Sequence, residues 1–428
     1  MSQQKSSYRW FVVGVFFFFM LLHQTDKLLI GSLQVQITDD FKINDFQWGL
    51  INSGALAVAT ILYPVWGYLY DRYARAKLLA LASLIWGATT WLNAVVRTYT
   101  GFLITRASTG IDDSSYPGIF TLIADYFGPN LRGKVYGLLQ LTSPLGFLAG
   151  MILGQIVAPM IGGWRSVFYI TGALGIVIAL LIYFGVREMP RGKAEPEFAD
   201  VPEMQTFQFS WQEAREIFKK KTMWFIFTQG FIGFFPWNVI VFFFFGYLET
   251  ERGYDGSAIV STMAPVIIIL AAGYFVGGFL GDMLFKRTKK GRIIVSSAGV
   301  LLGAIFLYLA MTTPLDNPSQ FFIYMCLTAL FMPFSSPNVI ATVYDITVPE
   351  VRSTAHAIEF FVENSGAVAA PALTGALIVA TQDKTFSILA ICVVAWILCF
   401  LIYLGALFTI DKDADDLRTQ MAERAKGM

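Results

Sequence analysis

Charged residues are scarce in this sequence: they make up 14% of its 428 residues, against about 25% in a soluble domain. Histidine and cysteine are scarcer still, with two His and three Cys. Three cysteines inside apolar runs supply neither a disulfide framework nor a zinc pattern, and two histidines argue against a metal site. The 31 basic residues nearly balance the 30 acidic ones, so the chain lacks the excess of positive charge that is typical of nucleic-acid-binding proteins. An ordinary soluble enzyme and a disordered chain are both excluded.

Apolar residues make up 56% of the chain, and they fall into twelve runs. Each run suits a bilayer core about 30 Å thick, which needs roughly 20 apolar residues per helix. The runs begin near Trp10, Phe46, Leu78, Phe102, Val135, Val167, Met223, Ser257, Ile293, Phe321, Thr354 and Phe386. The first is too long and too rich in Phe for a secretory signal. The sequence therefore predicts an all-α membrane protein with twelve transmembrane helices.

The Lys and Arg residues predict the orientation of these helices. With both termini in the cytoplasm, 24 of the 31 basic residues lie on the inner side. The other seven lie outside or within helices: Lys27, Lys42, Arg97, Arg106, Arg165, Arg252 and Lys384. We therefore expect a multi-pass protein of the cell (inner or plasma) membrane with two cytoplasmic termini.

An internal repeat divides the chain into two halves. At a shift of 220 residues the matched pairs are Pro117 with Pro337, Asp125 with Asp345, Pro129 with Pro349, Arg132 with Arg352, and Gly146 with Gly366. At a shift of 211 residues, Gly67 and Asp71 coincide with Gly278 and Asp282. Two pseudo-symmetric six-helix bundles are the economical interpretation, and parallel repeats of this kind are a transporter architecture.

The composition changes between the sixth and seventh runs, where residues 188–220 are polar. Ser210 followed by Glu213 forms a capping-box pattern, and apolar residues recur after it at helical spacing. The segment predicts either an amphipathic helix at the inner membrane surface or a simple linker. The expected domains are an N-terminal bundle at 1–187, the linker at 188–221, a C-terminal bundle at 222–411 and a cytoplasmic tail at 412–428.

Two loops carry the most specific motif. GYLYDRYARAK (67–77) and GFLGDMLFKRTKKGR (278–292) resemble the cytoplasmic loop motif of the major facilitator superfamily. Glycines there allow close helix packing, and the acids can cap a helix or pair with a basic residue when the inner side is closed. Alternatively, the basic residues merely obey the positive-inside rule. The predicted gating residues are Gly67, Asp71, Arg72, Arg132, Gly278, Asp282 and Arg352.

Other segments resemble one branch of that superfamily. QTDKLLIG (24–31), RASTGIDDSSYPGIFTLIADYF (106–127), GGFLGDMLFKRTKKGR (277–292) and PEVRSTAHAI (349–358) are similar to the spinster-like transporters, with some likeness to organic anion–proton symporters. Lys27 stands where the branch has Arg, and Asp113 where it has Glu. The resemblance implies that the acids at Asp26 and Asp113 take part in proton coupling and gating.

Ionisable residues inside a membrane are costly, which makes each a functional candidate. Asp26 is about 16 residues into its helix, so we expect it in the outer half of the bilayer, at an outward-facing polar site or at a wetted helix end. Arg106 and Asp113 share one helix face; Asp113 could take a proton, or the two could form a structural ion pair.

Two further acids, Glu359 and Glu363, are one turn apart on a stripe that should face inward. They could share a proton or bind a cationic group, unless Glu359 is simply wetted from the inner vestibule. The predicted proton-coupling residues are therefore Asp26, Asp113, Glu359 and Glu363.

Polar side chains beside helix breaks are the predicted substrate contacts. Pro236 should break or kink its helix, and broken helices near the midplane tend to line a cavity. The predicted substrate-binding residues are Lys27, Arg106, Tyr116, Gln140, Gln229, Trp237, Asn238 and Asn338.

These features together predict a secondary active transporter that works by alternating access. We expect it to be a monomer among membrane lipids that moves a small organic solute, an organic anion or an amphiphile, by symport or antiport with protons. The alternatives are a sodium-coupled or uncoupled facilitator, or a membrane sensor on a transporter scaffold. An enzyme is disfavoured because the chain lacks a His cluster or a nucleophile–base set. A primary pump is disfavoured because no phosphate-binding Gly-x-x-x-x-Gly-Lys stretch is present, and no cofactor is expected.

Overall fold

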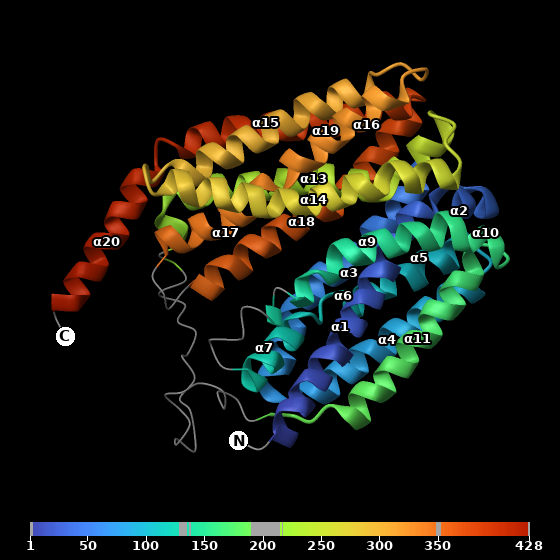
Figure 1. Ribbon diagram of the computed structural model, residues 1–428, viewed down its shortest axis with the longest axis horizontal. Coiled ribbons are helices and arrows are strands. Elements are labelled where there is room, and N and C mark those ends of the chain that lie inside the picture. Colours follow the sequence, from blue (N-terminus) through green and yellow to red (C-terminus); the bar gives the residue numbers. More distant parts are fainter. Residues whose placement is uncertain are drawn as a thin grey trace. The chain divides into compact units, whose positions relative to one another are not determined.

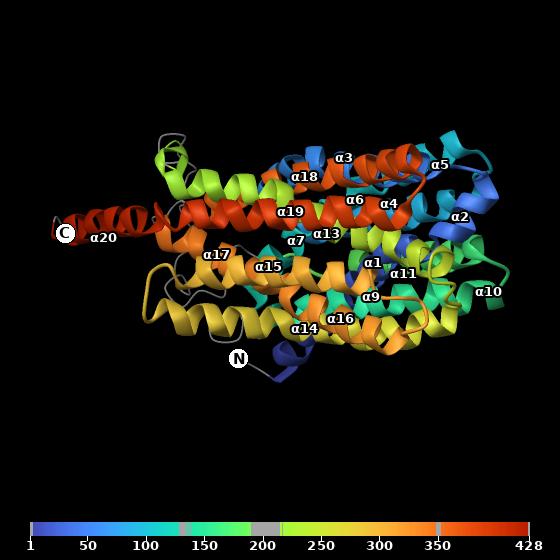
Figure 2. The ribbon, with the colours of Figure 1, turned by 90° about the horizontal axis from the view of Figure 1, so that it is seen from above.

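The computed structural model describes residues 3–127, 135–136, 138–189, 215, 217–347 and 352–426. Every regular element in these ranges is a helix (Figure 1, Figure 2). The chain divides into two compact units, residues 1–206 with 255–260, and residues 207–254 with 261–428. The predicted amphipathic segment around Ser210 lies outside the described residues, and the predicted domain boundaries stay predictions.

Unit 1 holds the helices of the first half. They are α1 (Gln3–Ser32), α2 (Gln34–Phe41), α3 (Asp45–Arg72), α4 (Arg75–Val95), α5 (Tyr99–Ser108), α6 (Gly110–Asp113), α7 (Pro117–Tyr126), α9 (Thr142–Ile152), the π-helical η1 (Leu153–Val157), α10 (Ala158–Met160) and α11 (Trp164–Gly185). Within the unit, α1 packs against α9 and α11, α4 packs along α11, and α3 packs against α5 and α6.

Unit 2 holds the helices of the second half, apart from residues 255–260. They are α13 (Lys221–Thr250), α14 (Gly256–Phe285), α15 (Gly291–Met311), α16 (Pro318–Phe331), the 3-10 helix η3 (Met332–Phe334), α17 (Ser335–Ile346), α18 (Arg352–Thr381), α19 (Lys384–Ala406) and α20 (Ile410–Lys426). Here α13 packs against α18 and α19, and α15 against α16, α17 and α19. Both views show α20 projecting beyond the other helices of the unit (Figure 1, Figure 2).

Eleven helices within the described ranges are long and apolar enough to cross a membrane. The remaining predicted span, which begins near Phe102, is divided into α5, α6 and α7. Pro117 is the first residue of α7. Because proline has no backbone N–H, the carbonyl of Asp113 cannot receive the usual hydrogen bond from four residues on. The twelve-helix fold is confirmed, with one span broken at the position of its acids.

The repeat-related span of unit 2 is also interrupted. The 3-10 helix η3 contains Pro333 and separates α16 from α17. In contrast, α13 runs through Pro236 as one helix, so the predicted break there is wrong. Transmembrane helices tolerate an internal proline where neighbouring groups satisfy the freed backbone.

Close helix contacts also follow the repeat. A β-carbon added at Gly146 on α9 would lie 2.6 Å from Cβ of Gln24 on α1. One added at Gly366 on α18 would overlap the carbonyl oxygen of Phe231 on α13. Small residues at such positions let helix backbones approach closely in a membrane. The glycines that matched at a shift of 220 residues therefore pack equivalent helix pairs.

Candidate functional site

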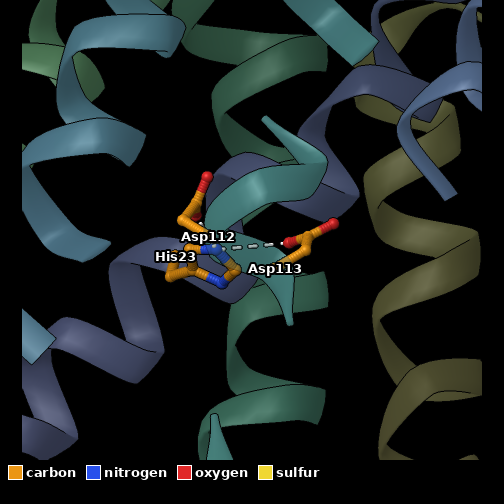
Figure 3. A group of neighbouring side chains, drawn as sticks. All are labelled: His23, Asp112 and Asp113. Carbon is orange, nitrogen blue, oxygen red and sulfur yellow. Dashed lines mark hydrogen bonds and ion pairs between the residues drawn. The ribbon is translucent and has the colours of Figure 1, made fainter. Parts of the chain in front are cut away.

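A group of ionisable side chains lies inside unit 1, where α1 passes the broken span. His23 belongs to α1, and Asp112 and Asp113 end α6. The Nε2 atom of His23 lies 2.6 Å from Oδ2 of Asp112 and 3.2 Å from Oδ1 of Asp113. Figure 3 shows the three side chains beside one another. The Nδ1 atom of His23 lies 2.6 Å from the hydroxyl of Tyr116, in the turn before α7. Together with Lys27, these residues form what we call the His23 cluster.

Two basic side chains add positive charge to this cluster. Nζ of Lys27 lies 3.3 Å from Oδ2 of Asp113, and the side chains are 32% and 10% exposed. Arg106 on α5 is buried and interacts with Asp113 through its charge. Its Nε has no hydrogen-bond partner among the described residues. Asp113 therefore forms its ion pairs with Lys27 and His23, and the alternative of an Arg106–Asp113 pair is not what the structure shows.

The geometry of the cluster suits shared protons. Ligand atoms of His23, Asp112 and Asp113 lie within 4.8 Å of one another, a spacing that could also hold a metal ion. Nε2 is already within hydrogen-bond distance of Asp112, and the ammonium of Lys27 occupies one oxygen of Asp113. Two of the atoms that a metal ion would use are therefore already engaged by groups of the protein.

Asp26 points away from the cluster, into the interior of unit 1. Its Oδ2 accepts hydrogen bonds from Nε1 of Trp86 at 3.2 Å and Oγ1 of Thr90 at 3.0 Å, both on α4. Its Oδ1 accepts one from Oγ1 of Thr171 on α11 at 2.8 Å. Asp26 is buried and links three helices, so the alternative of a wetted helix end is not what the structure shows, and its place in the outer half of the bilayer stays a prediction. Lys27, the next residue, points elsewhere because adjacent helical residues are about 100° apart.

A second group of acids lies on α18 in unit 2. Glu359 is 1% exposed, and neither carboxylate oxygen has a hydrogen-bond partner among the described residues. Nδ1 of His356 lies 3.3 Å from Oε2 of Glu359. The carboxyl of Glu363 interacts with that of Glu359 and faces Gly230 on α13. This stripe faces inward, as the small residues beside it predicted, and the alternative of a wetted Glu359 is not what the structure shows.

Unit 2 also contains a cavity of about 130 Å³. Two predicted substrate contacts, Gln229 and Trp237, line it. Oε1 of Gln229 is buried without a hydrogen-bond partner among the described residues, so it is available to a donor. The other polar or aromatic lining residues are Phe234, Tyr274, Ser335, Ser336 and Trp396.

Three predicted substrate contacts have other surroundings. Nδ2 of Asn238 donates to the carbonyl of Phe234 on its own helix at 2.8 Å. Nδ2 of Asn338 donates to the carbonyls of Gly277 at 2.9 Å and Phe334 at 2.8 Å, which ties the interrupted span to α14. Gln140 is exposed. The structure brings none of the three to the cavity or to the His23 cluster.

Equivalent ion pairs lie beside the two predicted gating loops. In unit 1, Nη1 of Arg75 lies 2.5 Å from Oδ2 of Asp125, and its Nη2 lies 2.8 Å from Oε1 of Glu188. In unit 2, Nη1 of Arg292 pairs with Asp345. Asp125 and Asp345 are a matched pair of the repeat. The loops of the two units are therefore held by the same kind of contact.

The contacts of the predicted gating residues differ from one residue to the next. Asp282 accepts from Nη2 of Arg292 at 2.9 Å, and Arg72 lies over the ring of Tyr68. Among the described residues, a β-carbon at Gly67 would meet nothing within 4 Å, whereas one at Gly278 would meet Pro337 at 3.6 Å. Gly67 therefore makes no close helix contact with the described residues of its own unit. The side chains of Asp71 and Arg352, and the whole of Arg132, lie outside the described part of the chain.

A sequence model of the Major Facilitator Superfamily matches residues 15–316. The chain belongs to the Major Facilitator Superfamily. It is thus a multi-pass membrane transporter, and members of this superfamily handle small-molecule substrates.

Within the superfamily the chain resembles the spinster proteins, as predicted. It is 27% identical to protein spinster of Drosophila melanogaster over 381 residues, which cover 86% of this chain and 62% of that protein. It is 26% identical to spinster homolog 1 of Homo sapiens over 389 residues, covering 85% of this chain and 72% of that one. A crystal structure of a bacterial homologue of the human lysosomal transporter spinster has the same fold. Its TM-score is 0.84 at 21% identity, over 96% of this chain and 99% of that one.

His23 and Asp112 were not identified from the sequence as members of the buried His23 cluster. The two histidines of the chain were taken only as too few for a metal site, and Asp112 lay off the face that Arg106 shares with Asp113. One signal was available: His23 is four residues before Lys27, so both lie on one face of the first span. The contact between His23 and Asp112 joins residues 89 positions apart, and spacing alone does not reveal it.

Proposed function

We propose that this chain is a secondary active transporter that couples the movement of a small organic solute to protons. The observation that carries the proposal is the carboxyl of Asp113, which lies between Lys27 and His23 on a broken helix. A carboxyl in that position responds to protonation, because losing its negative charge releases the ammonium of Lys27 and removes a negative charge from beside the His23 ring.

The solute we propose is an organic anion or an amphiphile. Arg106 is buried, and its Nε is unpartnered among the described residues, so its charge can serve an anionic group of the solute. Lys27 is partly exposed and can do the same once Asp113 is protonated. In unit 2, aromatic rings and the free oxygen of Gln229 line a cavity that suits an apolar part with one donor.

The acids of unit 2 supply a second proton-binding position in this proposal. Glu359 and Glu363 interact inside the unit, and two such carboxyls relieve their repulsion by sharing one proton. Asp26 remains a fourth candidate, although its three neutral donors also suit a carboxylate that fixes α1 against α4 and α11.

Relatives support transport rather than chemical conversion. One solved relative is described as a homologue of a lysosomal transporter, and we propose that this chain likewise converts no substrate. We further propose that it is a monomer in the cell (inner or plasma) membrane. We also propose that both termini lie in the cytoplasm, because the distribution of its basic residues favours that orientation.

The test is substrate-driven proton movement in liposomes. Purified protein is reconstituted with a pH-sensitive dye inside, and organic acids, sugar acids and lysolipids are added in turn. We expect one of these classes of solute to change the internal pH of liposomes that contain wild type, and not of liposomes that contain Asp113→Asn. The matched control is Asp316→Asn, which neutralises an exposed acid outside the spans and should behave as wild type.

Other outcomes separate the alternatives. Solute uptake that follows a sodium gradient without any pH change would establish a sodium-coupled transporter. Uptake without either gradient would establish a facilitator, and tight solute binding without uptake would establish a sensor. Each of these results contradicts the proposed proton coupling.

A further inference from the structure

His23 is surrounded by groups that differ in charge. Asp112 and Asp113 approach its Nε2 from α6, and Tyr116 approaches its Nδ1 from the turn before α7. Lys27, on the same helix, acts on it through its charge, and Trp86 on α4 meets the ring in a T-shaped contact with centroids 5.4 Å apart. Two further groups complete the titratable surroundings: Arg106 on α5, whose charge acts on Asp113, and Tyr63 on α3, on which the charge of Asp113 acts.

These contacts provide a hydrogen-bond partner for each nitrogen of a neutral imidazole ring. A neutral ring has one N–H donor and one acceptor nitrogen. The nearest group to Nε2 is a carboxyl oxygen of Asp112 at 2.6 Å, which accepts, so the proton belongs on Nε2. Nδ1 can then accept from the hydroxyl of Tyr116 at 2.6 Å. Every polar atom of the ring has a partner in this state.

The same contacts satisfy the imidazolium ion without movement of any heavy atom. Both ring nitrogens then donate. Nε2–H still donates to Asp112, and Nδ1–H donates to the oxygen of Tyr116, because a hydroxyl can either donate or accept. The added positive charge lies beside the second carboxyl, Asp113, at 3.2 Å. The site is therefore built for both protonation states of one ring.

A proton can reach the buried ring through its neighbours. The side chain of His23 is 3% exposed and that of Asp112 0%, whereas Asp113 is 10% and Lys27 32% exposed. The accessible edge of the cluster is therefore Lys27 and Asp113, and the nitrogen that receives an added proton is Nδ1, which lies against the hydroxyl of the half-buried Tyr116.

We propose that His23 binds the transported proton, with Asp112 and Tyr116 holding the ring in both of its protonation states. In each cycle the hydroxyl of Tyr116 passes its proton to Nδ1 and takes one from solvent on one side, so that one N–H bond forms on the ring. The same bond breaks on the other side, and the proton returns to solvent. This inference rests on the proposed proton-coupled transport and deepens it.

The two histidines of the chain allow a direct measurement. In the variant His356→Gln, His23 is the single imidazole, so ¹⁵N-histidine labelling gives one pair of ring signals. We expect the protein in lipid bilayers to convert from imidazolium to neutral imidazole between about pH 5 and pH 8. Asp112→Asn and Tyr116→Phe should each leave less imidazolium at a given pH, because the charged ring loses a partner. A ring that stays in one protonation state across the range overturns the proposal.

Transport assays then separate this inference from the proposed function. Gln at position 23 can hydrogen-bond to Asp112 but does not titrate, so His23→Gln should still exchange labelled solute across the membrane. Its solute-driven proton uptake should fall to the level of protein-free liposomes, while the exposed control Asp316→Asn keeps wild-type uptake. If His23→Gln moves protons as wild type does, the inference is overturned and the proposed function stands. If wild type moves no protons, the proposed function itself fails.

Discussion

Substituting Gly150 by alanine should separate two helices of unit 1. A β-carbon there would lie 2.7 Å from the carbonyl oxygen of Thr25 and 2.9 Å from the backbone nitrogen of Leu29, both on α1. Neither atom is the flexible end of a side chain. Since ordinary contact begins at 3.4 Å, α1 must move away by the difference, about 0.7 Å, within a tightly packed pair.

The change in unfolding free energy that we expect follows from two opposing effects. Overpacking of this kind costs about 1–3 kcal/mol, while exchanging glycine for alanine inside a helix gains about 1 kcal/mol. Gly14 supplies the matched control on α1, because a β-carbon there would meet nothing within 4 Å in the part of the chain that the structure describes. The two alanine variants should therefore differ in unfolding free energy by about 1–3 kcal/mol, with Gly150→Ala the less stable.

The assay is thermal unfolding in detergent, followed by the fluorescence of tryptophans. One kcal/mol corresponds to a Tm shift of about 2–4 °C for a unit of this size. We expect Gly150→Ala to unfold about 2–12 °C below Gly14→Ala. Equal Tm values for the two variants would refute the close packing of α1 against α9.

Three further results are expected. Arg75→Gln should lower the unfolding free energy by about 3–5 kcal/mol because it removes the buried cation that lies 2.5 Å from the buried carboxylate of Asp125. The double variant Arg75→Met/Asp125→Leu should recover most of this loss in a double-mutant cycle. Trp237→Ala should raise the KM for the solute in liposome uptake with kcat less affected, since it removes part of the cavity wall. Lys289→Gln should change stability by less than about 1 kcal/mol, because its pair with Asp415 is largely exposed and screened; a larger change in denaturation midpoint would contradict this.

Most of the fold could be predicted from the sequence because a bilayer constrains chains strongly. Apolar runs of sufficient length predicted the spans, and Pro117 and Pro337 revealed the repeat because proline restricts backbone geometry in the same way in both halves. The break expected at Pro236 was wrong, since whether a helix continues through proline depends on neighbouring groups that no local pattern specifies.

The candidate site could be predicted only in part. Asp113 and Glu363 were found because ionisable residues in apolar runs are conspicuous. The partners of Asp113 could not be assigned, because helix spacing suggested Arg106 on the same face, whereas the structure supplies Lys27 and His23 from another helix. Long-range pairing of this kind depends on how the broken span packs against α1.

The central claim is proton coupling, and its most direct test is uphill accumulation. Liposomes with sodium-free buffer on both sides receive an imposed pH gradient, and the internal concentration of the identified solute is followed over time. The account predicts accumulation above the external concentration for wild type, its collapse when a protonophore dissipates the gradient, and its absence in Asp113→Asn. Accumulation that does not depend on the pH gradient, or that persists in Asp113→Asn, would contradict the account.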